Sequence, residues 1–342
     1  MPQISIIIST YNSEKYISKT VKDVLASKFC DYELIIVNDG STDGTSKILS
    51  KLALCDERIK IIEQENTGPG GARNAGLCAA VGEYVLLLDD DDALGKKALL
   101  QYSEAAQNSP DIVIGGYIMC RDEKQTEFKT DDISGYTHAA FLALLPDIID
   151  SHLGYIVWNK LYKKSVIDEF GIRFTDYRSC EDRLFNIEFY RRVKKFTIIS
   201  NPLYIYTLHA QSGLNNKFLP DRAASLDDFY SSIRALYENG CPKHAENIFA
   251  NAYIKGIYAL IISTFHTSCQ LSKQQKRDYI KNAVCGENAA LAVKSAKPGV
   301  KMLIPTLCLK IKSVKLCTLC ARLINYTDQN FHSLFMKLKH GK

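Results

Sequence analysis

The stretch GEYVLLLDDDD, Gly82–Asp92, decides the fold class, because an apolar run leads directly into four consecutive carboxylates. A continuous run of Val and Leu is typical of a buried parallel strand, and ligands bind at the carboxyl ends of such strands. Adjacent carboxylates repel one another, so an ordered cluster is best tolerated beside a divalent cation or hydrogen-bond donors. The alternative is a solvated acidic turn that caps a helix expected to begin near Leu94.

The preceding part of the chain repeats this strand pattern. Three apolar runs predict buried strands: Ile4–Ser9, Tyr32–Val37 and Arg58–Ile62. Helical segments separate the runs, and this alternation predicts an α/β fold with a Rossmann-like, mainly parallel central sheet flanked by helices. The carboxyl ends of its strands then form one ligand-binding edge. The polar residues expected at that edge are Thr10–Asn12, Asn38–Asp43 and Asp89–Asp92.

The glycine spacing disfavours two other classes of nucleotide-binding enzyme. No GxGxxG follows the first strand, and the Gly68–Gly71 cluster has Arg73 where the final glycine would stand. The phosphate-binding pattern GxxxxGK[ST] is also missing from the sequence. The phosphates of a nucleotide would therefore be held by a metal and by cations such as Arg73.

The composition is that of a globular protein, with 342 residues of which 46% are hydrophobic and 24% are charged. Eleven cysteines without a signal peptide or a disulfide-type spacing predict reduced thiols in the cytosol. Cys317 and Cys320 form one CxxC, but no second pair follows it. Buried or membrane-facing thiols are therefore favoured over a zinc site.

The C-terminal tail is strongly basic. Residues 301–342 hold eight Lys and Arg against one acid, Asp328, whereas the rest of the chain holds 35 basic and 37 acidic residues. Because the cations alternate with Leu, Ile, Val and Phe, the tail favours an anionic membrane surface over nucleic acid. No run spans a bilayer, since Met302–Leu309 is broken by Pro305. The alternative is a basic helix packed on the protein itself.

Five ordered motifs resemble family 2 of the glycosyltransferases. They are IIISTYN (Ile6–Asn12), ELIIVNDGSTDGT (Glu33–Thr45), NTGPGGARNAG (Asn66–Gly76), GEYVLLLDDDD and CEDRLFN (Cys180–Asn186). The resemblance implies a GT-A fold, a nucleoside diphosphate sugar donor such as a UDP-sugar, Mn²⁺ or Mg²⁺, and inversion at the anomeric carbon. The expected division is a GT-A domain at 1–214, a helical module at 215–300 and the basic apolar tail at 301–342. In the helical module, Ser272–Gln275 reads as a capping box.

On the donor side, the resemblance implies nucleotide-binding roles for three regions. The loop that frames the base and ribose consists of Thr10, Tyr11 and Asn12. Asp39 matches the carboxylate that accepts a hydrogen bond from uracil, and Arg73 matches the arginine beside the base and phosphates.

The resemblance also places a DxD motif at Asp89, Asp90 and Asp91. Asp91 then coordinates the metal, and Asp89 contacts the ribose and is a second metal ligand. Asp90 is assigned to nucleotide-sugar binding and replaces a serine that is frequent in the family. His209 stands where some relatives place a histidine near the metal or the pyrophosphate. The alternative for His209 is a structural histidine.

On the acceptor side, Asp182 is the candidate general base, and Glu181 supports it or contacts the acceptor. The alternative is that both acids fill the first turn of a helix, where the helix dipole favours them. Trp158, in the segment WNKLY, either lines the acceptor cleft or belongs to the core.

We therefore expect an inverting, metal-dependent hexosyl- or N-acetylhexosaminyltransferase that extends a glycan or lipid-linked acceptor in surface polysaccharide synthesis. It is expected in the cytoplasm, peripheral at the inner face of the cell membrane, with no nucleic acid partner. One alternative is a catalytically silent scaffold of a polysaccharide-assembly complex, against which the intact acidic motifs argue. The other is a sugar nucleotidyltransferase, whose Gly- and Arg/Lys-rich N-terminal signature is missing from the sequence.

Overall fold

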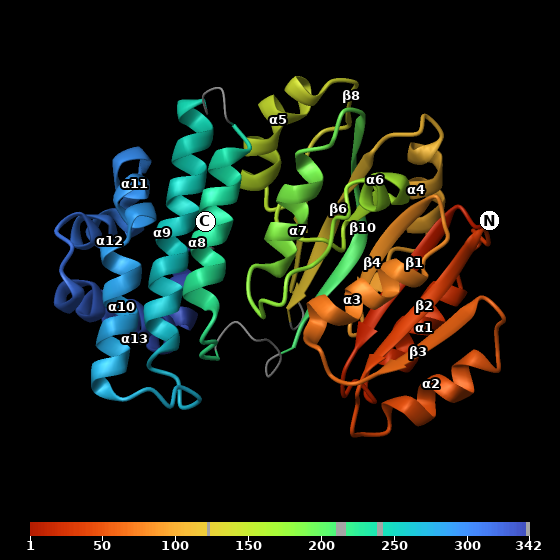
Figure 1. Cartoon of the computed structure of the whole chain (residues 1–342), viewed down its shortest axis with the longest axis horizontal. Helices are drawn as coiled ribbons and strands as arrows, with labels where there is room; N and C mark the ends of the chain where they lie inside the picture. Colours follow the sequence, from red (N-terminus) through yellow and green to blue (C-terminus); the bar gives the residue numbers. More distant parts are fainter. Residues whose placement is uncertain (122–123, 210–216, 238–241, 340–342) are drawn as a thin grey trace. The chain divides into compact units, whose positions relative to one another are not determined.

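The chain forms two compact units, Met1–Ser212 and Gly213–Lys342 (Figure 1). The computed structural model describes residues 1–121, 124–209, 217–237 and 242–339, with the backbone alone from residue 328. The expected boundary after residue 214 lies outside the described residues. The finer division at residue 300 stays a prediction.

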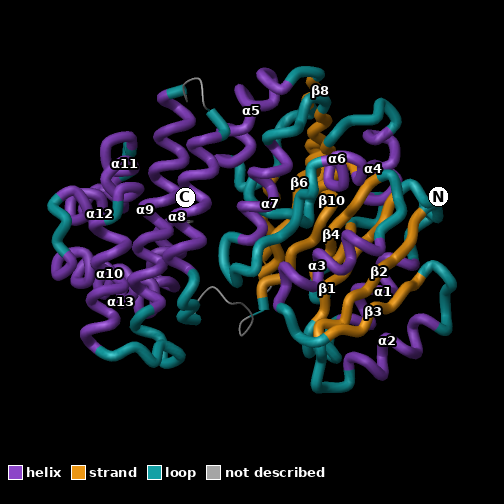
Figure 2. The backbone as a smooth tube through the Cα atoms, viewed as in Figure 1, coloured by secondary structure: helices purple, strands orange, loops and turns teal. Residues whose placement is uncertain are grey.

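The first unit is built on a sheet in the order β3-β2-β1-β4-β9-β6-β10-β5 (Figure 2). Its first half is the expected parallel part, and the bounds are β1 (Ile4–Thr10), β2 (Tyr32–Asp39), β3 (Ile59–Gln64) and β4 (Tyr84–Asp89). Each of the four sequence-predicted strands is confirmed, with ends that agree or shift by at most three residues. β1, β2 and β4 are almost wholly buried, which explains why their apolar runs are continuous.

The register of these strands brings the polar residues to one edge. β1 pairs in parallel with β2 and β4, so that Thr10 lies opposite Asn38 and Ser9 lies opposite Asp89. The carboxyl ends of the three strands therefore end side by side, as the sequence predicted.

The second half of the sheet is mixed. β9 (Lys160–Lys163) lies between β4 and β6 (Ile112–Arg121) and is antiparallel to both, whereas β10 (Phe196–Leu208) runs parallel to β6. The remaining strands are β5 (Ala93–Leu94), β7 (Lys124–Phe128) and β8 (Ile133–Gly135), each paired antiparallel to β6 or β10.

The prediction of a helix that begins near Leu94 was wrong. Ala93 and Leu94 form β5, which pairs with Ile205 and Tyr204 of β10, and the helix α4 (Ala98–Ala106) begins later. The physical reason is that the acids before β5 are tied to β10 rather than to a helix N-terminus.

The other helices in the described residues of this unit are α1 (Ile17–Leu25), α2 (Thr45–Ala53), α3 (Gly68–Ala79), α5 (His138–Asp150), α6 (Lys164–Glu169) and α7 (Glu181–Tyr190). Of these, α3 packs on β1 and β2 at close range. A Cβ on Gly76 would lie 2.3 Å from Cγ2 of Ile7, so only glycine permits this approach.

The second unit is helical, with α8 (Arg222–Ala235), α9 (Lys243–Ser263), α10 (Lys273–Cys285), α11 (Glu287–Ser295), α12 (Val300–Lys310) and α13 (Val314–Lys339). The other five helices all contact α9. The capping box at Ser272 and Gln275 is confirmed. Cys317 and Cys320 are buried thiols. Among the described residues, no helix is long and apolar enough to cross a bilayer.

Candidate active site

Asp39 ends β2 and anchors the start of α3. Its Oδ1 accepts hydrogen bonds from the Thr67 backbone N–H and the Gln64 side chain, both at 2.8 Å, and its Oδ2 accepts one from the Gly68 N–H at 2.9 Å. A carboxylate is favoured at this helix N-terminus. Asp39 thus orients the helix that carries Arg73, and its contact with a base stays a prediction.

The loop after β1 is fixed by Asn12, which adopts a left-handed φ of 54°. Its N–H donates to Ser41 Oγ at 2.9 Å, and its Oδ1 accepts from the Thr42 N–H at 2.7 Å. Thr10 is buried, but Tyr11 is half exposed. This turn therefore presents an aromatic ring at the ligand-binding edge.

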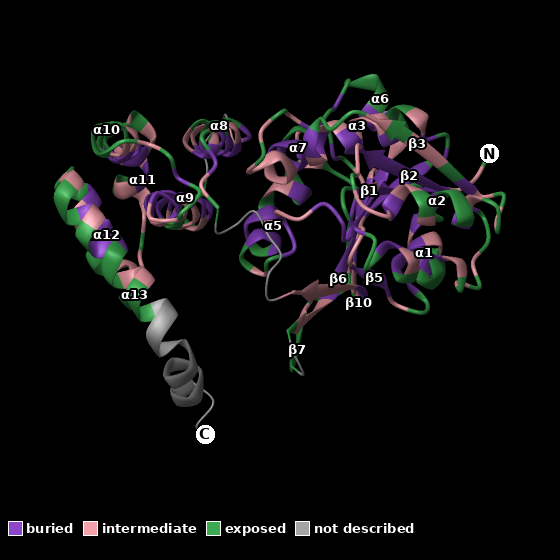
Figure 3. Cartoon of the chain, turned by 90° about the horizontal axis from the view of Figure 1, so that it is seen from below, coloured by how far each residue is buried: buried purple, intermediate pink, exposed green. Residues whose placement is uncertain are grey.

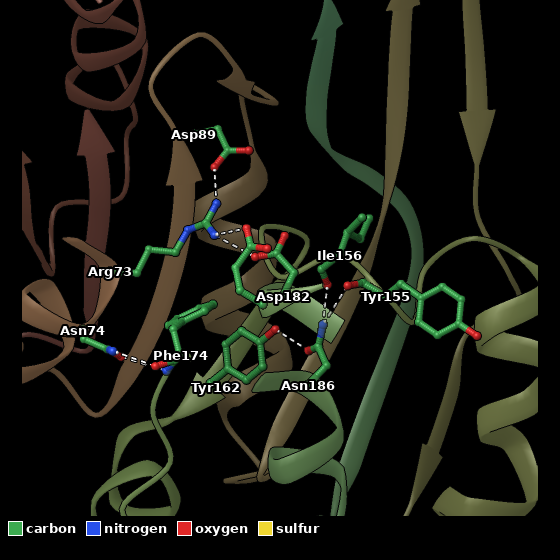
Figure 4. Close-up of polar contacts among 10 residues, drawn as sticks. Arg73, Asn74, Asp89, Tyr155, Ile156, Tyr162, Phe174, Asp182 and Asn186 are labelled. Atoms are coloured by element: carbon green, nitrogen blue, oxygen red, sulfur yellow. Dashed lines mark hydrogen bonds and ion pairs between the residues drawn. The ribbon is translucent and has the colours of Figure 1, made fainter. Parts of the chain in front are cut away.

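Arg73 is the centre of the site. Its side chain is only 9% exposed, and its guanidinium faces three carboxylates (Figure 4). Nη2 lies 3.1 Å from Asp89 Oδ1, and Nη1 lies 2.7 Å from Asp182 Oδ1 and 3.6 Å from Glu181 Oε1. The ring of Phe174 packs 5.3 Å from the guanidinium carbon. One buried cation thus links the end of β4 to the first turn of α7.

Asp182 lies in an environment that favours its protonated form. Burial raises the pKa of Asp182 above the ordinary aspartate range, and the nearby Arg73 guanidinium opposes this shift. Glu181 and Asp89 raise the pKa further by like-charge repulsion. A carboxylate with a raised pKa is better matched to proton transfer near neutral pH than an ordinary one.

The acids at the end of β4 differ in their surroundings. Asp92 is buried, and it accepts hydrogen bonds from the Tyr204 hydroxyl at 2.8 Å and from the Thr207 N–H at 2.7 Å. Asp92 is therefore a structural acid that ties this loop to β10. Burial raises the pKa of Asp90 to about 6 and also raises the pKa of Asp91.

His209 lies beside the acidic loop, and a contact with a metal or pyrophosphate stays a prediction. Its Nε2 is 3.6 Å from Asp91 Oδ2, and its ring packs on Tyr16 at a centroid distance of 4.5 Å. The structure thus brings together a carboxylate that follows β4 and an imidazole that follows β10.

Comparison with known proteins shows the family of the first unit's matched residues. Residues 5–171 match the model of glycosyl transferase family 2. This part of the chain belongs to glycosyltransferase family 2. The putative glycosyltransferase EpsH of Bacillus subtilis is 28% identical over 276 residues, which cover 80% of this chain and 77% of the relative.

Two further relatives of the glycosyltransferase come from Staphylococcus aureus. The poly(ribitol-phosphate) beta-N-acetylglucosaminyltransferase TarP is 29% identical over 245 residues, covering 70% of this chain and 72% of TarP. The crystal structure of TarS 1–349 in complex with UDP-GlcNAc has a TM-score of 0.69 at 20% identity, covering 95% of this chain and 92% of that chain. At this identity the likeness establishes the fold, a GT-A-like α/β unit followed by helices.

The enzyme has a donor set that fits a divalent cation in part. Within the described ranges, no group of three or more His, Cys, Asp or Glu is arranged to hold a metal. Asp89 and Asp91, at and just after the end of β4, offer carboxylate oxygens, and His209 offers an imidazole 3.6 Å from Asp91. Mg²⁺ is commonly held by one or two carboxylates, with substrate phosphates as further ligands, and this incomplete set fits that pattern.

Trp158 is only 5% exposed in the enzyme. Its ring stacks on Tyr204 at a centroid distance of 4.1 Å, and the Tyr204 hydroxyl accepts from the Asp89 N–H at 3.1 Å and donates to Asp92. Trp158 therefore supports the acidic loop through Tyr204. A direct contact with the acceptor stays a prediction.

Sequence reasoning missed a set of buried side chains that hold the backbone of residues 153–156. Tyr190 donates to Gly154 O at 2.6 Å, and Asn186 donates to the Tyr155 and Ile156 carbonyls at 3.1 Å. Both donors lie on α7, the helix whose first turn contains Asp182. The segment thus fixes the position of α7.

Lys160 completes this clamp from β9. Its ammonium is fully buried and donates to Leu153 O at 2.6 Å, to Asn159 Oδ1 at 2.6 Å and to Ile156 O. Burial lowers the pKa of Lys160, and the charge of Asp182 opposes the shift. Three acceptors match the three N–H donors of an ammonium. No local sequence signal indicates this role, because Lys160 begins a strand of only four residues, KLYK.

Proposed function

We propose that the enzyme transfers a sugar from a UDP-sugar to a hydroxyl of a glycan or lipid-linked acceptor, with inversion and with Mg²⁺ or Mn²⁺. The observation that carries this proposal is the position of Arg73 between Asp89 and Asp182. In a GT-A-like unit, Asp89 ends the strand assigned to the donor side, and Asp182 lies in the first turn of the helix assigned to the acceptor side. A single cation in contact with both suits a transfer between two neighbouring subsites.

The donor assignment rests on the edge formed by β1, β2 and β4. Tyr11 offers an exposed ring on which a base can stack, and Asp39 fixes the adjoining start of α3. The TarS structure with UDP-GlcNAc and the N-acetylglucosaminyltransferase TarP make UDP-N-acetylhexosamines the first donors to test. The name of TarP, which gives poly(ribitol-phosphate) as the acceptor of that enzyme, also supports a polymeric acceptor.

Asp91, Asp89 and His209 would hold the metal together with oxygens of the diphosphate. The cation supplies charge stabilisation for the leaving diphosphate. Arg73 contributes a second, fixed positive charge next to Asp89.

Asp182 acts as the general base in this proposal. It accepts the proton of the acceptor hydroxyl while the hydroxyl oxygen forms a bond to the anomeric carbon. The bond from that carbon to the phosphate oxygen breaks on the opposite face, its electron pair leaves with UDP, and the configuration inverts. The clamp on residues 153–156 holds α7, so the carboxylate stays at a fixed place beside Arg73.

A panel of sugar nucleotides tests the proposal. With Mn²⁺, the correct UDP-sugar is expected to raise the melting temperature, because a ligand that binds only the folded protein stabilises it. The same donor with an acceptor extract is expected to release UDP. Release of pyrophosphate from a sugar phosphate and UTP would instead identify a nucleotidyltransferase. No shift with any sugar nucleotide would favour a silent scaffold.

A further inference from the structure

The helix α12 carries an apolar stripe that its own unit leaves exposed. The stripe consists of Val300, Leu303, Ile304, Leu307 and Ile311. These side chains are 49–92% exposed and recur every three or four residues, so they share one side of the helix. The opposite side holds Pro305, Thr306 and Leu309, which are buried.

The described part of α13 repeats this pattern. Leu316, Leu319, Leu323 and Tyr326 are 42–59% exposed, whereas Cys317, Cys320 and Ala321 are buried. Figure 3 shows exposed residues along both helices.

The buried sides of both helices face α9. The Tyr258 hydroxyl of α9 donates to Pro305 O at 2.9 Å, and α13 also contacts α9. The alternative that we expected for the tail was a basic helix packed on the protein itself. These buried sides are packed in that way. The two exposed stripes lie on the other sides of the helices.

The charges around the stripes have a single sign. Between Asn288 and Thr327 the sequence has seven Lys and Arg and no Asp or Glu. Lys301 and Lys310 lie next to the α12 stripe along the helix, Lys312 and Lys315 lie between the two stripes, and all four are exposed. This arrangement is complementary to a surface that is anionic outside and apolar beneath. Lysine side chains can reach headgroups while the stripe enters the acyl boundary.

We propose that α12 and the described part of α13 bind an anionic lipid surface, lying in its plane with the exposed stripes inserted. Apolar insertion and attraction to acidic headgroups act together in such interfacial helices. The inference does not rest on the proposed donor or acceptor. Its failure would leave the sugar-transfer reaction untouched.

Co-sedimentation of the full chain with vesicles tests the proposal. The chain is expected to bind vesicles that contain phosphatidylglycerol and to bind pure phosphatidylcholine at least about tenfold more weakly, since each cation near an acidic surface adds attraction. The triple variant L303S/I304S/L307S is expected to bind vesicles that contain phosphatidylglycerol at least about tenfold more weakly than the wild type does. The reason is that it removes three exposed apolar side chains. The matched control is L54S/V81S, which removes exposed apolar residues of the first unit.

A charge-reversal variant separates the two contributions. K310E/K312E/K315E is expected to lose the preference for phosphatidylglycerol, whereas all variants keep the wild-type melting temperature because the changed side chains are exposed. Equal binding to both kinds of vesicle would overturn the proposal. So would undiminished binding by L303S/I304S/L307S, or self-association of the chain that this variant abolishes without any vesicle binding.

Discussion

Replacement of Asp182 by asparagine separates catalysis from folding in this enzyme. Asparagine keeps the shape of the side chain, and its Oδ1 can still accept the 2.7 Å hydrogen bond from Arg73. The amide cannot take a proton from the acceptor. A general base contributes about 10²- to 10⁴-fold, so turnover is expected to fall by that factor. At ~1.4 kcal/mol per factor of ten, this is about 3–5 kcal/mol in the activation free energy.

The stability of the Asp182→Asn variant is expected to change little. Arg73 keeps two carboxylate neighbours, Asp89 and Glu181, so its charge stays compensated. The variant loses the charge attraction between Arg73 and Asp182. The neutral asparagine side chain costs less free energy to bury than a carboxylate, and this offsets the loss. The free energy of unfolding is therefore expected to change by ~1 kcal/mol. UDP binding is expected to persist.

Turnover is measured as UDP release with a saturating donor, and UDP affinity by calorimetry. Glu181→Gln is the matched control, since this carboxylate is 3.6 Å from the same guanidinium nitrogen. It is expected to retain turnover within about tenfold of the wild type, because it removes charge without removing the base. If Asp182→Asn keeps wild-type turnover, or if Glu181→Gln is the inactive variant, the assignment of the base is wrong.

Four further predictions follow from the described contacts. Turnover is expected to rise with pH, because the base must be deprotonated and burial raises the pKa of Asp182; a pH profile checks this, and Asp182→Asn should lack the acidic limb. Asp91→Asn is expected to weaken UDP binding about tenfold with Mn²⁺ but not with EDTA, and an equal loss in both titrations would contradict a metal role. Lys160→Met is expected to lower the free energy of unfolding by ~2 kcal/mol, because buried carbonyls lose their donor; urea denaturation measures it, and no loss would contradict the clamp. Gly76→Ala is expected to cost ~1–3 kcal/mol through overpacking against β1, whereas Gly299→Ala, with no atom within 4 Å of its new methyl, serves as the control.

The parallel half of the fold could be predicted from local sequence because a strand that is buried on both faces has a continuous apolar run. Every position in β2 is buried, and its apolar run ends where its polar residues reach the edge of the sheet. β9 has no such apolar run. It has four residues, two of them lysines, and its Lys160 reads as a surface residue until the surrounding carbonyls are known.

The candidate site was predictable only in part for a similar reason. Arg73 and Asp182 are separated by 109 positions, and no local pattern pairs them. The family resemblance placed Arg73 on the donor side and Asp182 on the acceptor side, without the contact between them. The acids at the end of β4 are chemically identical in sequence. Only the contacts of Asp92 with Tyr204 and Thr207 distinguish a structural acid from its neighbours.

The position of Arg73 has a consequence for engineering new acceptor specificities. Its helix, α3, belongs to the first hundred residues, whereas two of the three acids that it contacts belong to α7. A chimaera that joins the early strands of this enzyme to the later half of a relative would therefore have to match charges across the junction. Exchange of the two halves succeeds only when an arginine on one side meets an acidic pair on the other.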